Sequence, residues 1–298
     1  VGAIAAAVVL LSILLSQMLT RKISTLLTAI RKVRAGAYEH RTHISGRDEI
    51  AQIGEEFNSL TDRLQTTETL RRRFVSDASH ELKTPLAAIR LLTDSILQTD
   101  QMDMETVRDF VTDIGSEAER LSRITEDLLR LTRLDSDLLD APETVEVALV
   151  LEQVMRMMSL LAQEKGTELT YRMEENCRVS ATKGEVHQVI YNLTDNAVKY
   201  SGKNGKVRVE LRHEDHDVVL TVADNGPGIP EEDLPKVFER FYRVDKARSR
   251  AAGGTGLGLS IVQDTVKKRG GTVSAANRPN GGAVFTVRWP EAEGGDRS

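Results

Sequence analysis

Residues 253–260 read GGTGLGLS and residues 224–230 read DNGPGIP, two glycine clusters in the last third of the chain. Glycine permits positive φ angles and lets the backbone approach a ligand closely. The first cluster opens a predicted helix over 257–268, whose first N–H groups suit a phosphate. Neither cluster is a P-loop, since no lysine follows, and Ile261 replaces the last glycine of a dinucleotide-binding GxGxxG. The glycines alone fit a nucleotide site or a mobile loop without a ligand.

An upstream helix predicted over 185–200 adds polar side chains at one-turn spacing. Asn192 and Asn196 are four residues apart and therefore share a helix face, and Lys199 follows on nearly the same face. Amide oxygens can complete a Mg²⁺ shell together with phosphate and water oxygens, and a lysine can neutralise phosphate charge. The same spacing also fits an ordinary surface face, so this pattern is weak by itself.

The region after Pro142 mixes short strands with helices, which predicts an α+β sandwich with helices on one face of a mixed sheet. Strand-like runs lie at 144–147, 168–173, 207–212, 218–224, 272–276 and 283–289. Helical stretches lie at 149–165, 185–200 and 257–268.

The region from residue 21 to about residue 135 is predicted to be almost entirely helical. Apolar seams at 23–33 and 50–64 flank a polar connector over 35–47, and their average 3.5-residue spacing predicts a parallel coiled-coil dimer. A longer helix pair follows, with a break at 98–103. This pair predicts an αα-hairpin, and two copies of it would form a four-helix bundle.

One histidine in the first helix of this hairpin is predicted to face solvent. In SDASHELKTPL (76–86), His80 lies two residues before the seam residue Leu82, or about 200° around the helix. A lone surface histidine ordinarily has no function, but here Glu81 could orient the ring or accept its proton. Pro85 leaves the Glu81 carbonyl without its usual helical partner. These neighbours indicate a reactive histidine.

The first 20 residues carry no charge and would form about 30 Å of helix, enough to span a bilayer core. Five basic residues and no acid follow in 21–34, so the positive-inside rule makes the rest cytoplasmic. A buried core helix is the alternative. Because the chain begins with Val1, we expect it to be a fragment that lacks an external sensor and another span.

Composition excludes several classes of protein. The 298 residues allow two or three domains, and 40% hydrophobic residues argue against wholesale disorder and against a polytopic membrane protein. A single cysteine, Cys177, excludes a disulfide framework and any multi-cysteine metal site. A net charge of −5 argues against direct binding of nucleic acid.

Taken in order, the motifs SHELKTPL, NLTDNAVKYS, DNGPGIP, FERFYR and GGTGLGLSI resemble those of membrane-bound sensor histidine kinases of two-component systems. The stretch GRDEIAQIGEEFNSL (46–60) is similar to the second half of a HAMP linker. The resemblance implies a dimeric helical phosphoacceptor domain followed by a Bergerat-type ATP-binding domain. The expected parts are a transmembrane helix (1–20), a HAMP linker (21–72), a dimerisation and phosphotransfer domain (73–138), a catalytic ATP-binding domain (142–290) and a disordered tail (291–298).

The resemblance also implies roles for single residues. His80 would be phosphorylated, Glu81 would act as base or orienter, and Thr84 would help a water to dephosphorylate the partner regulator. Asn192 and Asn196 would hold Mg²⁺ and the phosphates. The other residues implied in nucleotide binding are Lys199, Tyr200, Asp224 for the adenine amino group, Gly226 and Gly228 for the base pocket, and Gly254, Thr255, Gly256, Leu257 and Gly258 for the phosphate lid. Phe238, Phe241 and Tyr242 resemble the aromatic motif that packs the lid.

The implied function is a plasma-membrane homodimer that takes phosphate from ATP onto His80 and passes it to an aspartate of a separate response regulator. Phosphatase activity toward that regulator is also implied. Two alternatives stay open: a nucleotide-binding membrane scaffold without phosphotransfer, and a clamp-type ATPase. ATP binding without turnover would favour the scaffold, and turnover without a phosphoprotein would favour the clamp.

Overall fold

The structure is a computed structural model that describes residues 2–99, 102–134, 141–202, 204–245 and 254–292. Its contacts divide the chain into two units, Val1–Asp77 and Ala78–Ser298. Most of the predicted tail, residues 293–298, lies outside the described residues. The two tail residues that are described belong to the fold, since Glu291 N donates to His216 O at 2.9 Å and Ala292 N donates to Arg178 O at 2.9 Å.

The first unit begins with a single long helix, α1 (Gly2–Arg34), which contains both the apolar segment and the first linker seam. Among the described residues it is the one helix that is long and apolar enough to cross a membrane, with a mean hydropathy of 2.2 over its most apolar window. The polar connector begins where it was predicted, directly after Arg34. Asn58 secures this connector, because its amide accepts from Thr42 N at 2.8 Å and donates to Thr42 O at 3.0 Å.

The second helix, α2 (Glu49–Gln98), is continuous over 50 residues. The second linker seam and the phosphoacceptor helix were predicted as separate segments, and that separation is wrong in the structure. No glycine or proline lies between residues 65 and 78, so nothing in the local sequence ends the helix there. Asp48 begins α2 by accepting from Ala51 N at 3.0 Å. A hydrogen bond from Lys22 lowers the pKa of the Asp48 carboxyl.

The predicted helical hairpin is confirmed, with α2 ending at Gln98 and α3 running over Met104–Leu134. Asp103 begins α3 by accepting from Thr106 N at 2.8 Å. Ile124 and Leu131 of α3 are fully buried. Pro85 lies inside α2 and is buried, and the helix continues through it.

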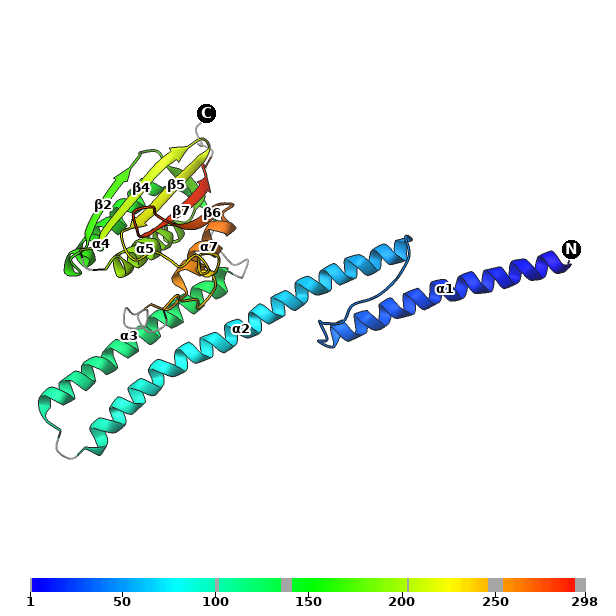
Figure 1. Ribbon diagram of the computed structural model, residues 1–298, viewed down its shortest axis with the longest axis horizontal. Coiled ribbons are helices and arrows are strands. Elements are labelled where there is room, and N and C mark those ends of the chain that lie inside the picture. The colour runs from blue at the N-terminus through cyan, green and yellow to red at the C-terminus, as the bar shows by residue number, and fades with distance from the viewer. Residues whose placement is uncertain (1, 100–101, 135–140, 203, 246–253, 293–298) are drawn as a thin grey trace. The chain divides into compact units, whose positions relative to one another are not determined.

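The rest of the second unit is the predicted α+β sandwich (Figure 1). Its five-stranded mixed sheet has the order β2-β4-β5-β7-β6, with β2 and β4 parallel and the other neighbours antiparallel. The strands are β2 (Glu168–Met173), β4 (Lys206–Glu214), β5 (Asp217–Asp224), β6 (Thr272–Asn277) and β7 (Ala283–Pro290). A second sheet pairs β1 (Glu143–Glu146) with β3 (Arg178–Ala181), and sequence analysis missed β3.

Three helices pack against one face of the larger sheet: α4 (Val147–Glu164), α5 (Lys183–Tyr200) and α7 (Gly258–Lys268) (Figure 1). A capping box begins α5, in which Thr182 accepts from Glu185 N and the Glu185 side chain accepts from Thr182 N. The helix register buries Val189, Ile190 and Leu193 in the core. The same register leaves Asn192, Asn196 and Lys199 half-buried on the opposite side, where the candidate site lies.

Candidate active site

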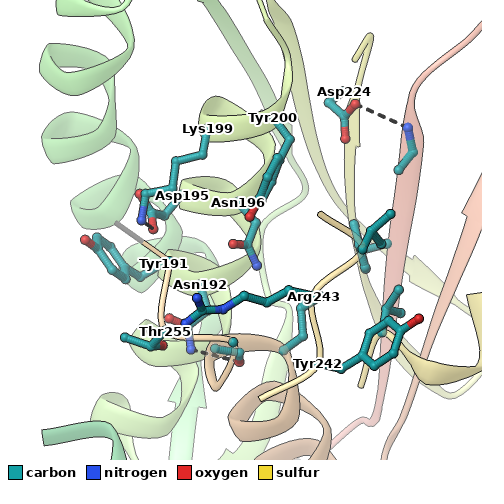
Figure 2. Close-up of a pocket in the computed structure, with 18 of the residues that line it drawn as sticks. Tyr191, Asn192, Asp195, Asn196, Lys199, Tyr200, Asp224, Tyr242, Arg243 and Thr255 are labelled. Atoms are coloured by element: carbon teal, nitrogen blue, oxygen red, sulfur yellow. Dashed lines mark hydrogen bonds and ion pairs between the residues drawn. The ribbon is translucent and has the colours of Figure 1, made fainter. Parts of the chain in front are cut away.

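A cavity of about 660 Å³ lies between α3, α5, the end of β5 and the loop that precedes α7 (Figure 2). Ten of the residues implied for nucleotide binding line it: Asn192, Asn196, Lys199, Tyr200, Asp224, Gly228, Gly254, Thr255, Gly256 and Gly258. Gly226 and Leu257 belong to the same loops but do not line the cavity. Residues distant in sequence therefore meet at one concave surface.

Asp224 ends β5 and is 4% exposed at one end of this cavity. Its Oδ1 accepts from Gly226 N at 2.8 Å. The same oxygen accepts from Ala283 N on β7 at 3.2 Å (dashed in Figure 2). Burial raises the pKa of the Asp224 carboxyl, and these two hydrogen bonds oppose the shift. Both bonds use one oxygen, so the second oxygen can accept a hydrogen bond from a ligand that enters the cavity.

The glycines around Asp224 lie where the backbone leaves no room for a side chain or has a positive φ. A Cβ on Gly226 would lie 2.3 Å from Tyr200 O. Gly228 has φ +75°, an angle at which a residue with a side chain would be strained. A Cβ on Gly282, whose φ is +90°, would lie 2.0 Å from Asp224 O. Sequence reasoning missed Gly282, although the NGG triplet at 280–282 marks a turn of this kind.

Two further residues that sequence reasoning missed hold the loop after β5. The Asn277 side chain accepts from Ile229 N at 2.8 Å and donates to Ile229 O at 2.6 Å. Arg278 Nη1 donates to Asp224 O at 2.7 Å. Asn277 ends β6 and Arg278 follows it, so only the sheet pairing brings them to the loop after β5.

The other end of the cavity suits phosphate. The N-terminus of α7 opens here at Gly258, and Asn192 Nδ2 donates to Gly258 O at 3.2 Å. Lys199 Nζ lies 2.5 Å from Asp195 Oδ2, so its positive charge is held at the wall of the cavity. A helix N-terminus and a lysine together form a site for an anion.

Helix α3 contributes a wall that the sequence did not predict. Asp127, Arg123 and Arg130 of α3 line the cavity. Thr255 Oγ1 donates to Asp127 Oδ2 at 2.8 Å, and Arg130 donates to Gln188 of α5. Burial raises the pKa of the Asp127 carboxyl, and the bond from Thr255 opposes this.

His80 is exposed on α2, as its spacing predicted, and it does not line the cavity. Thr84 Oγ1 donates to the His80 carbonyl at 3.1 Å. Glu81 connects this helix to the cavity, because its Oε2 lies 3.1 Å from Nη2 of Arg243, which is a lining residue. Arg243 closes the FERFYR motif, yet sequence analysis assigned it no role.

Three family models match the chain in sequence order. They are the HAMP domain over residues 14–66, the His Kinase A (phospho-acceptor) domain over 70–137, and the histidine kinase-, DNA gyrase B-, and HSP90-like ATPase over 181–293. The chain belongs to the sensor histidine kinase family. Family membership accounts for the α+β sandwich that follows a helical hairpin, and it makes that sandwich an ATP-binding domain.

Individual members show the extent of the similarity. The signal transduction histidine-protein kinase AfsQ2 of Streptomyces coelicolor is 35% identical over 280 residues, which cover 88% of this chain and 51% of AfsQ2. The chain thus spans about half the length of this curated relative. Full-length ShkA, solved in complex with AMPPNP, is 29% identical with a TM-score of 0.54, covering 76% of this chain and 46% of ShkA. ThkA, solved with the response regulator TrrA, shares the fold at 22% identity, with a TM-score of 0.61 and coverage of 77% and 66%.

Proposed function

We propose that the chain is a membrane-bound histidine kinase that phosphorylates His80 from ATP and passes the phosphoryl group to an aspartate of a separate response regulator. One observation carries this proposal. The nucleotide cavity and the phosphoacceptor helix are connected through Arg243, which lines the cavity, and Glu81, which is adjacent to His80.

The proposed ATP contacts follow from the chemistry of the two ends of the cavity. Asp224 would accept a hydrogen bond from the adenine amino group, whereas guanine would present a carbonyl to the carboxylate. Lys199 and the first N–H groups of α7 would bind the phosphates. Tyr200 and the lid residues over 254–258 would enclose the nucleotide.

Mg²⁺ fits this donor set. The described residues contain no cluster of three or more His, Cys, Asp or Glu that could hold a metal alone. Mg²⁺ is usually bound through few protein oxygens together with substrate phosphates, and Asn192 and Asn196 offer two amide oxygens on one face of α5. The metal would neutralise charge on the phosphates.

In the proposed reaction, a ring nitrogen of His80 attacks the γ-phosphorus in line. A P–N bond forms, the P–O bond to ADP breaks, and Glu81 accepts the ring proton or orients the ring. In-line transfer of this kind is catalysed chiefly by positioning. Thr84, one turn after His80, would later position a water for regulator dephosphorylation.

We also propose a homodimer at the plasma membrane, with the domain boundaries that the sequence predicted, except that the ATP-binding domain includes Glu291 and Ala292. Large apolar side chains remain exposed along the helices, among them Leu60, Leu64, Leu86 and Val111. A second copy would cover such stripes in a coiled coil and a four-helix bundle. The apolar part of α1 would cross the bilayer, with the basic residues of 21–34 on the cytoplasmic side.

The test is phosphorylation of the whole chain in lipid nanodiscs with γ-labelled ATP and Mg²⁺. We expect label that is lost in acid and survives base, that disappears in His80→Gln, and that persists in His216→Gln, which changes an exposed histidine elsewhere. His80→Gln should still bind ATP. Label that persists in His80→Gln would refute the assignment. Binding without label in the unsubstituted chain would favour the scaffold.

A further inference from the structure

Glu81 is bound by two arginines through the same oxygen. Its Oε2 lies 3.4 Å from Arg120 Nη2 and 3.1 Å from Arg243 Nη2. The side chains of Arg120 and Arg243 are 7% and 4% exposed, and that of Glu81 is 20% exposed. Such charge-assisted contacts, shielded from water, are stronger than a surface ion pair.

The two arginines have different origins. Arg120 lies on α3, in the same helical hairpin as Glu81, and also contacts Glu117 at 3.6 Å. Arg243 follows Glu81 by 162 residues and belongs to the ATP-binding domain, in the segment after η1 (Leu234–Lys236). The Arg120 contact is therefore internal to the hairpin, whereas the Arg243 contact joins the hairpin to the ATP-binding domain.

Arg243 also belongs to the phosphate end of the cavity. It lines the cavity together with Asn192 and Lys199 (Figure 2). Its Nε packs against the glycine loop before α7, since a Cβ on Gly256 would lie 3.1 Å from it. A guanidinium binds carboxylate and phosphate with the same planar donor fork, so both are suitable partners for Arg243.

We propose that Glu81 and the terminal phosphate of a nucleoside triphosphate compete for Arg243. This inference rests on the proposed function and concerns its regulation. A triphosphate would draw Arg243 away from Glu81, which stays on Arg120 and becomes available to His80. A diphosphate lacks the competing group and would leave the Glu81–Arg243 contact in place. The coupling is reciprocal, so the contact must lower affinity for triphosphate.

The test compares nucleotide affinities of the whole chain in lipid nanodiscs, using displacement of a fluorescent nucleotide by AMPPNP or ADP. In Glu81→Gln, we expect AMPPNP to bind about fivefold more tightly while ADP affinity is unchanged. Arg243→Gln should weaken AMPPNP binding selectively. Adding Glu81→Gln to Arg243→Gln should have no further effect on AMPPNP affinity, because the arginine for which the two groups compete is gone. Equal changes for the two nucleotides, no change in Glu81→Gln, or additive effects would overturn the proposal.

Matched control variants separate competition for Arg243 from general effects of removing a charge. Glu119→Gln removes an exposed acid from α3, and Arg240→Gln removes an arginine that contacts Asp264 at 3.0 Å. Both should leave the ratio of AMPPNP to ADP affinity unchanged. Arg243→Lys keeps the positive charge but lacks the planar donor group of a guanidinium. It replaces Arg243→Gln in the test if that variant does not fold. Since binding is measured without phosphotransfer, failure of His80 labelling with this affinity pattern intact would refute the kinase assignment alone.

Discussion

The phosphoacceptor helix and the nucleotide cavity of this protein place their polar groups in opposite ways. His80 and Thr84 are exposed on one turn of α2. Asp224 is buried, and its cavity is lined from α3, α5, β5 and the loop before α7. In the proposed reaction, His80 is reached first by a nucleotide and then by a regulator, so exposure serves it. A nucleotide site gains selectivity from buried polar groups that a wrong ligand leaves unpaired.

This difference predicts how each region responds to substitution. Side chains on an exposed helix face can be replaced at little cost to stability, so their variants should change chemistry alone. Residues at the cavity are packed against backbone from other elements, so their variants should change stability and binding together.

Gly282→Ala should have the largest effect. The added Cβ would lie 2.0 Å from Asp224 O at φ +90°, so strain and overpacking should together cost about 3 kcal/mol of stability. ATP affinity should fall with it. Thermal unfolding can be followed by fluorescence of the single tryptophan, Trp289, which is buried in this domain. Gly281→Ala is the control, with φ +88° but open space around its Cβ. Equal loss in the two variants would show that strain, not close packing, governs this turn.

Thr84→Ala should have an intermediate effect confined to chemistry. Its hydroxyl is exposed and donates to the His80 carbonyl, so stability should hold. Dephosphorylation of the regulator should slow about tenfold, the cost of one lost hydrogen bond, while His80 labelling is unchanged. Thr84→Ser keeps the hydroxyl and should behave like the unsubstituted chain. If labelling and dephosphorylation fall equally, Thr84 has no separate role.

Asp224→Asn should change stability by a small amount, in the direction opposite to Gly282→Ala. Burial raises the pKa of Asp224 above its unfolded value of 3.8, so folding favours the protonated carboxyl. The stability that this preference contributes is complete below pH 3.8 and is lost as the pH rises through the folded pKa. At pH 7 the asparagine variant should therefore unfold about 2 °C to 4 °C higher, and the difference should close toward pH 4. Its ATP affinity should fall. Asp217→Asn, at the other end of β5, should keep ATP affinity. Lower stability of Asp224→Asn at pH 7 would contradict the desolvation argument.

Periodicity made the local features of this protein predictable from sequence alone. The exposure of His80 followed from its position relative to Leu82, and the shared face of Asn192 and Asn196 followed from their spacing. Both predictions depend only on helix geometry, which is the same in any surroundings. The positive φ angles of Gly228 and Gly256 are local in the same sense, since glycine adopts them without strain.

The tertiary structure alone decided which distant residues meet. Sheet pairing brings Asn277 to Ile229, and it brings Arg278 and Gly282 to Asp224. Packing of the hairpin brings Asp127 to Thr255 and Glu81 to Arg243. No periodic pattern encodes these contacts, because they join segments far apart in the chain whose approach depends on the whole core. The sequence by itself therefore determined the elements and the reactive groups they carry. The folded core determined which carboxylate each arginine binds, because a charge removed from water takes the partner that packing places beside it.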